Sequence, residues 1–181
     1  MNPIRLVAVD GGRTSRPPLK ADETSALLDA IAAALSRELH TSCTFDGALD
    51  ATFAHHPERN QYHSTAILDR LALNAPTTTL GVTSLDLYIP ILTFVFGEAQ
   101  LGGTCAVVSY HRLAQEFYGL PPDPLLRKER LIKEAIHELG HTAALTHCDD
   151  YECVMAASHA VEWLDLKSAR LCAQCRAYWP S

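Results

Sequence analysis

Apolar residues follow two different spacings at the start of the chain, and each spacing predicts one kind of element. Residues 4–10 form a short apolar run that ends at Asp10, which is typical of a buried strand. Over residues 23–39, apolar positions recur with the 3.6-residue period of an amphipathic helix, and Asp22 is a candidate N-cap. The polar stretch 55–60 indicates a loop. A strand followed by a helix therefore opens the fold.

The pattern alternates further along the chain. Residues 62–73 have helical spacing, and a loop with three prolines precedes a helix over about residues 125–143, for which Asp123 or Pro124 suits the start. Gly102 and Gly103 predict a turn. Extended segments are predicted at residues 43–45, 78–83, 85–89, 93–96 and 104–109. Strands and helices thus alternate up to residue 145, which predicts an α/β (α+β) fold with a mixed sheet, whereas the tail reads as irregular.

Length and charge narrow the class of protein. The 181 residues suit one domain, which we expect to consist of an N-terminal subdomain (1–144) and a C-terminal subdomain (145–181). A net charge of −6 argues against broad nucleic-acid binding and against an anionic membrane surface. No apolar stretch approaches the roughly 18 residues of a membrane span, and the first run is too short for a signal peptide. We therefore expect a cytoplasmic monomer.

Chemistry concentrates in the sequence His137-Glu138-Leu139-Gly140-His141, followed by His147. Two histidines four residues apart on a helix project from one face, so both rings can reach the same metal ion. His147 would complete three protein ligands and leave a fourth position open, which distinguishes a catalytic zinc from a structural one. Glu138 is then placed to act as general base on a metal-activated water.

A bare His-Glu-x-x-His pattern also occurs by chance. The helical context, the third histidine and Met155 shortly afterwards all favour the functional interpretation. Other histidines are weaker candidates. His55, His56 and His63 are interpreted as a solvated loop and helix start, and His111 and His159 as residues that could line a cleft.

Four cysteines after His147 form a second constellation. Cys148, Cys153, Cys172 and Cys175 have the spacing of a closed structural zinc site. Two disulfides, or an iron–sulfur cluster, are the alternatives. The tail is too short for a hydrophobic core of its own, and a metal can substitute for one. We expect two zinc ions per chain, one catalytic and one structural, and we expect the structural site to anchor His147.

The chain also resembles the archaemetzincins, a branch of the metzincin metalloproteases. The segments that carry the resemblance are His147-Cys148, Cys153-Val154-Met155, Cys172-Ala173-Gln174-Cys175, residues 133–136, 94–99 and 165–167, and more weakly 59–62. The resemblance implies a sheet with a backing helix, an active-site helix and a short zinc-bound C-terminal subdomain. It also implies that Met155 lies beneath the zinc without binding it, and that substrate adds a strand to an edge just before the Gly102-Gly103 turn.

Two departures from that family matter. Ala144 stands where the family usually has a glycine that turns the chain out of the helix, often at positive φ, and alanine there would cost about 1 kcal/mol. The spacing from Met155 to Cys172 is one residue shorter than usual. The leading hypothesis is a zinc metalloprotease, a hydrolase acting on peptides or proteins. The alternatives are a zinc-stabilised peptide- or protein-binding module with little or no activity, or a weak two-histidine site in which His147 points away.

Overall fold

A five-stranded sheet forms the centre of the structure, a computed structural model that describes residues 3–12, 21–73 and 75–179. The strands lie in the order β2-β1-β5-β8-β7. The first four are mutually parallel, and β7 joins antiparallel to β8 at one edge. Their bounds are β1 Ile4–Asp10, β2 Cys43–Asp50, β5 Thr79–Thr83, β7 Gly97–Ala99 and β8 Cys105–Ser109. The sheet is therefore mixed, as the alternating pattern predicted.

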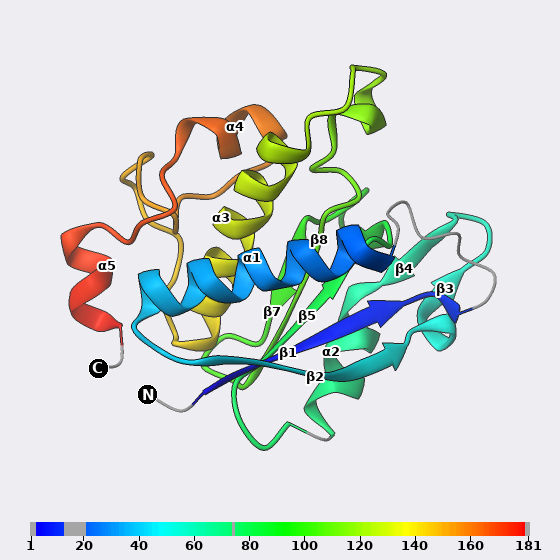
Figure 1. Ribbon diagram of the computed structural model, residues 1–181, viewed down its shortest axis with the longest axis horizontal. Coiled ribbons are helices and arrows are strands. Elements are labelled where there is room, and N and C mark those ends of the chain that lie inside the picture. Colours follow the sequence, from blue (N-terminus) through cyan, green and yellow to red (C-terminus); the bar gives the residue numbers. More distant parts are fainter. Residues whose placement is uncertain (1–2, 13–20, 74, 180–181) are drawn as a thin grey trace.

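Helices cover both faces of this sheet. Two helices, α1 (Ala21–Leu39) and α3 (Pro124–Thr142), pack on one face, and α2 (Ser64–Ala72) packs on the other. The alternation of side chains in β8 serves both layers. Ala106 and Val108 join the core under α1 and α3, whereas Cys105 and Val107 join the core under α2. Figure 1 shows α1 crossing in front of the strands.

A smaller sheet extends the molecule on the α2 side. It contains β3 (His55–His56), β4 (Gln61–His63) and β6 (Leu87–Tyr88), in that order. Short 3-10 helices occur at Thr52–Ala54 and Gln115–Tyr118. In Figure 1, α4 (Val161–Leu166) and α5 (Ala173–Tyr178) lie on the opposite side of the molecule from β3 and β4.

The prediction of an irregular tail was wrong, because residues 161–166 and 173–178 form α4 and α5. Both helices are too short to show a hydrophobic period in the sequence. Their buried residues Val161, Leu164 and Cys175, together with Val154 and Met155, pack into the same core cluster as α1 and α3. The tail is therefore stabilised partly by packing against α3.

Other sequence predictions are confirmed or corrected. Asp123 caps α3, because its carboxylate accepts a hydrogen bond of 2.9 Å from the Leu126 amide. The helix predicted to follow Asp22 begins at Ala21, so Asp22 lies within its first turn. The strand predicted at residues 93–96 is absent except for one bridge from Val95 to Leu87, and the edge strand begins at Gly97. The loop predicted at residues 55–60 starts with the two residues of β3.

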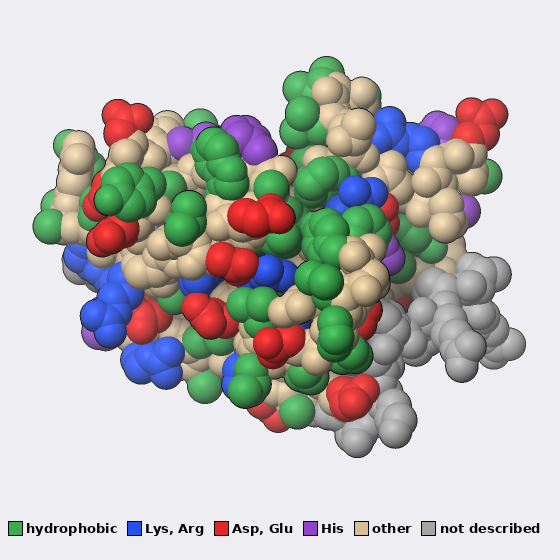
Figure 2. Space-filling model, turned by 90° about the horizontal axis from the view of Figure 1, so that it is seen from above, with side chains coloured by type: hydrophobic (Ala, Val, Ile, Leu, Met, Phe, Trp, Pro, Cys, Tyr) green, Lys and Arg blue, Asp and Glu red, His purple; other side chains and the backbone are tan. Residues whose placement is uncertain are grey.

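Surface charge is mixed on the face shown in Figure 2, where acidic, basic and hydrophobic side chains are interspersed. Within the described residues, none of the helices combines the length and the apolar character that crossing a membrane would require.

Candidate active site and metal centres

Helix α3 positions two of the three predicted zinc ligands. His137 and His141 lie one turn apart on it, with ring centroids separated by 4.6 Å. Each ring is oriented by a backbone carbonyl of the following segment. Nδ1 of His137 lies 2.9 Å from the Val154 oxygen, and Nδ1 of His141 lies 2.7 Å from the Leu145 oxygen. A carbonyl can only accept, so both Nδ1 atoms carry a proton and both Nε2 atoms present a lone pair.

A left-handed residue turns the chain out of α3. The helix ends at Thr142, and Ala144 has a φ of +63°. The Leu145 amide donates to the Gly140 carbonyl at 3.0 Å, which closes the last turn in the manner of a helix C-cap. The positive φ expected at this position is thus present, although the residue is alanine. The turn brings His147 back to the other two histidines, with ring centroids 5.3 Å from His137 and 5.1 Å from His141.

The three rings fit a single cation. A ring nitrogen from each histidine lies within 4.8 Å of the others. The two unprotonated Nε2 atoms of His137 and His141 are 3.1 Å apart. Two lone pairs at that distance repel unless a cation lies between them, and tetrahedral zinc with Zn–N bonds of about 2.0–2.1 Å places its ligand nitrogens roughly 3.3 Å apart. Burial lowers the pKa of all three rings, which favours the unprotonated form that binds metal.

Glu138 lies beside this triad and is buried, with 5% of its surface exposed. Burial raises its pKa well above the ordinary value, and the nearby carboxylate of Glu134 adds to the effect, whereas the Lys167 ammonium opposes it. A Cβ added to Gly97 would lie 2.7 Å from both Cγ and Oε1 of Glu138. The glycine in the edge strand therefore makes the space for this side chain, a relationship that the sequence analysis missed.

A buried ion pair supports the floor of the site and was also missed. The Lys167 ammonium lies 3.4 Å from Oε1 of Glu134 and donates a hydrogen bond of 3.0 Å to the Ala156 carbonyl. Both side chains are almost fully buried. Lys167 thereby joins the tail to α3 one turn before Glu138. Lys167 directly follows the exposed Leu166 at the end of α4, and nothing in this local pattern predicts that a lysine here is buried.

Met155 packs against Gly140, which lies between the two histidines of α3 in the sequence. It is completely buried, and a Cβ added to Gly140 would overlap its sulfur atom. Its carbonyl accepts a hydrogen bond of 3.0 Å from the Cys148 amide. The glycine of the helical motif is therefore explained by the methionine that lies against it.

A cleft of about 410 Å³ opens over the histidines. One wall is the segment that leads into β7, and the other combines α3 with residues 157–159. His159, a candidate from the sequence, lines this cleft. His111 does not line it: its Nδ1 lies 3.1 Å from the Ser84 carbonyl, and its ring packs on Phe117.

The three remaining histidines considered in the sequence, His55, His56 and His63, each pack against a tyrosine ring of the small sheet. His56 and His63 pack against Tyr88, with ring centroids at 5.8 Å and 5.4 Å, and His55 packs against Tyr62 at 4.9 Å. Within the described part of the chain, none of them belongs to a group of three or more metal-ligating side chains. The interpretation as a loop was wrong for His55 and His56, which form β3, whereas His63 ends β4 and is the N-cap residue at the predicted helix start.

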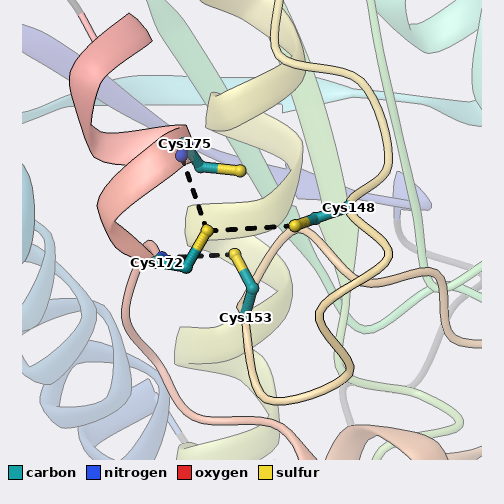
Figure 3. Close-up of side chains that lie close together, drawn as sticks. All are labelled: Cys148, Cys153, Cys172 and Cys175. Carbon is teal, nitrogen blue, oxygen red and sulfur yellow. Dashed lines mark hydrogen bonds between the residues drawn. The ribbon is translucent and has the colours of Figure 1, made fainter.

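The four cysteines converge on one point, as Figure 3 shows. All four sulfur atoms lie within 4.8 Å of one another, and all four residues are free thiols. The sulfurs of Cys148 and Cys172 are 3.9 Å apart, close to the roughly 3.8 Å edge of a zinc tetrahedron with Zn–S bonds of about 2.3 Å. The Cys175 amide points at the Cys172 sulfur and lowers the pKa of that thiol. The cluster thus fits a closed four-thiolate zinc site.

The sequence is similar to those of known proteins. A family model described as peptidase family M54 matches residues 58–178. The archaemetzincin of Methanocaldococcus jannaschii is 46% identical over 123 residues, which cover 68% of each chain. The archaemetzincin of Pyrococcus furiosus is 45% identical over 121 residues, 65% of this chain and 63% of that protein.

Solved structures agree over almost the whole chain. A crystal structure of archaemetzincin from Methanopyrus kandleri superposes with a TM-score of 0.80 at 36% identity, covering 97% of this chain and 92% of that one. The archaemetzincin of Archaeoglobus fulgidus, crystallised with malonate, gives 0.81 at 32% identity, with coverage of 97% and 99%.

Proposed function

This chain belongs to peptidase family M54, the archaemetzincins, and is a zinc metallopeptidase; from that premise we propose that His137, His141 and His147 hold its catalytic zinc and that Glu138 is the general base. The observation that carries the assignment is the pair of facing Nε2 atoms 3.1 Å apart, on rings whose other nitrogens are already used as donors. Without a cation this arrangement is repulsive.

Zinc, when bound, supplies the Lewis acidity that lowers the pKa of a water molecule to about 7. The residues of the chain do the rest. Glu138 takes the proton of the attacking water and delivers it to the leaving amide nitrogen. The exposed edge of β7 pairs with an extended peptide and aligns its scissile bond with the triad. The Val154 and Leu145 carbonyls keep the His137 and His141 rings oriented.

We further propose a second, structural zinc at Cys148, Cys153, Cys172 and Cys175. Its role follows from the chain sequence, because Cys148 directly follows His147 and fixes the position of that residue. Residues 145–181 then act as a C-terminal subdomain of one catalytic domain, with residues 1–144 as the N-terminal subdomain. The cleft and both clusters come from one chain, so we propose that a monomer is active on peptides or proteins.

The competing function is a zinc-stabilised binding module with little or no hydrolysis. Glu138 discriminates between the two, because a protein that only binds peptide has no use for a buried carboxylate beside the metal ligands. Membership of a peptidase family also favours the enzyme.

The test is digestion of a peptide library by the zinc-loaded protein, by Glu138→Ala and by Glu162→Ala, which removes an exposed glutamate on α4. Chelator-sensitive cleavage by the wild type and by Glu162→Ala, but not by Glu138→Ala, supports the proposal. Equal, chelator-insensitive cleavage by all three proteins would contradict it.

A further inference from the structure

The wall of the cleft opposite α3 includes β7, which the sheet holds through β8, and the residues that precede β7. Leu92, Thr93 and Phe94, here called the rim, form the part of this wall that no sheet pairing holds. The rim is outside any strand, yet two of its carbonyl groups are bound by side chains from a distant segment. The Leu92 and Thr93 oxygens accept hydrogen bonds of 3.1 Å and 3.0 Å from Nη2 of Arg59.

Gln61 connects this arginine to the rim. Its Oε1 accepts a hydrogen bond of 2.8 Å from Nε of Arg59. Its Nε2 donates to the Thr93 carbonyl and to Oδ2 of Asp86, both at 3.0 Å. Gln61 is 6% exposed, so both ends of its amide are satisfied away from bulk water. The donors and acceptors around it leave one orientation of the amide.

Arg112 completes the network from the far side. Its guanidinium forms two hydrogen bonds to Asp86, of 2.6 Å and 2.7 Å, and lies 4.3 Å from the centre of the Phe94 ring. Paired, planar bonds of this kind are the strongest that an arginine makes to a carboxylate. The network therefore contacts the rim twice, at the backbone through Arg59 and Gln61 and at the Phe94 side chain through Arg112.

The four residues of this network do not line the cleft, so they do not touch a peptide bound there; they are Arg59, Gln61, Asp86 and Arg112. They act on the rim, which does line the cleft. We infer that Gln61 and Arg59 are positioning residues for the peptide substrate, which hold the rim at the distance from α3 that an extended peptide on β7 requires. The inference rests on the proposed function, because it takes the cleft to be the peptide site.

The test measures kcat and KM for cleavage of a fluorogenic peptide by the wild type and by each variant. The zinc content and the thermal unfolding midpoint of each protein are measured alongside. Gln61→Glu places a carboxylate against Asp86 and the Thr93 carbonyl. Arg59→Ala removes the two hydrogen bonds from Arg59 to the rim and leaves the one from Gln61. Each variant should raise KM about threefold to tenfold, the factor that ordinary hydrogen bonds carry, with kcat changed less than about twofold and the zinc content unchanged. Arg59→Lys should recover part of the loss.

Arg70→Ala is the matched control. Arg70 and Arg59 are both exposed, and each stacks on one aromatic ring at 4.2 Å, Arg70 on Phe53 and Arg59 on Tyr88. Arg70 has no bond to the rim, so its removal should leave KM unchanged.

If Arg59 and Gln61 only stabilised the fold, their substitution would not raise KM while leaving kcat and the zinc content nearly unchanged. Amide hydrogen exchange adds a measurement that does not depend on cleavage: the Leu92 and Val95 amides, which donate to the Ile89 and Leu87 carbonyls, should exchange faster in Arg59→Ala. The inference would be overturned if Gln61→Glu and Arg59→Ala left KM unchanged and Arg59→Ala left amide exchange unchanged. It would also be overturned if Arg70→Ala raised KM as much as Arg59→Ala does. Either result would leave the proposed function intact. A wild-type protein that cleaves no peptide would remove both.

Discussion

Gly97 and Glu138 approach so closely that no side chain fits between them. The glycine is in the edge strand β7, and the glutamate is in α3. A Cβ on Gly97 would lie 2.7 Å from the glutamate side chain and 2.8 Å from the Val107 carbonyl. Because the second neighbour is backbone within the sheet, the strand cannot move away, and the glutamate would have to move instead.

We therefore predict that Gly97→Ala lowers kcat by about 10²-fold, since a displacement of roughly 1 Å at a catalytic group has that effect. The zinc content should not change, because Glu138 is not one of the proposed zinc ligands. Steady-state kinetics and elemental analysis measure the two quantities. An alanine variant with wild-type kcat would show that the position of Glu138 is not critical.

The Lys167–Glu134 pair should matter for stability. Lys167→Met leaves the Glu134 carboxylate buried without a counter-ion, which we expect to lower the free energy of unfolding by about 3–5 kcal/mol. Urea denaturation measures the loss. Adding Glu134→Gln to the same protein should restore part of it, because the uncompensated charge is removed. If Lys167→Met unfolds within about 0.5 kcal/mol of the wild type, the pair is not important for stability.

Ala144 occupies a left-handed conformation that glycine adopts without strain. Ala144→Gly should raise the free energy of unfolding by up to about 1 kcal/mol. Ala143→Gly is the matched control, because Ala143 has a φ of −84° and should lose about 0.5–1 kcal/mol through backbone entropy. Opposite signs for these adjacent substitutions in urea denaturation would verify the turn. Loss of stability in both variants would contradict the strain at Ala144.

Zinc binding at the histidines should tolerate mild acid. Burial lowers the pKa of His137, His141 and His147, so the folded rings stay unprotonated below the ordinary value of about 6.5. Protons then begin to compete with zinc only as the pH falls through these lowered pKa values. We expect affinity for the histidine site to be nearly constant from about pH 7.5 to pH 6.5 and to decrease below that range.

Chelator competition at each pH measures this affinity, with His147→Ala as the reference that leaves only the cysteine site intact. A steep loss of histidine-site zinc already between about pH 7.5 and pH 6.5 would show that the rings have ordinary pKa values.

Local patterns in the sequence predicted the central strands and helices well. Strand β1 and the start of α3 at Asp123 follow from local rules of apolar runs and capping, which depend only on neighbouring residues. The convergence of His137, His141 and His147 also follows from helical geometry and one tight turn. These features are local, so the sequence contains the information directly.

The predictions failed where contacts between distant residues decide the structure. Residues 93–96 have strand-like composition, but the Thr93 carbonyl is bound by Arg59 and Gln61 instead of a neighbouring strand. The approach of Gly97 to Glu138 depends on how β7 lies over α3, which no spacing reports. The burial of Lys167 depends on Glu134, 33 positions earlier in the chain.

Metal content tests the central claim most directly. Elemental analysis of the purified wild type should give two zinc ions per chain, one held by the histidines and one by the cysteines. His147→Ala should reduce the count to one, and Glu138→Ala should leave it at two. A wild-type protein with a single zinc, unchanged by His147→Ala, would show that the three histidines do not form a metal site.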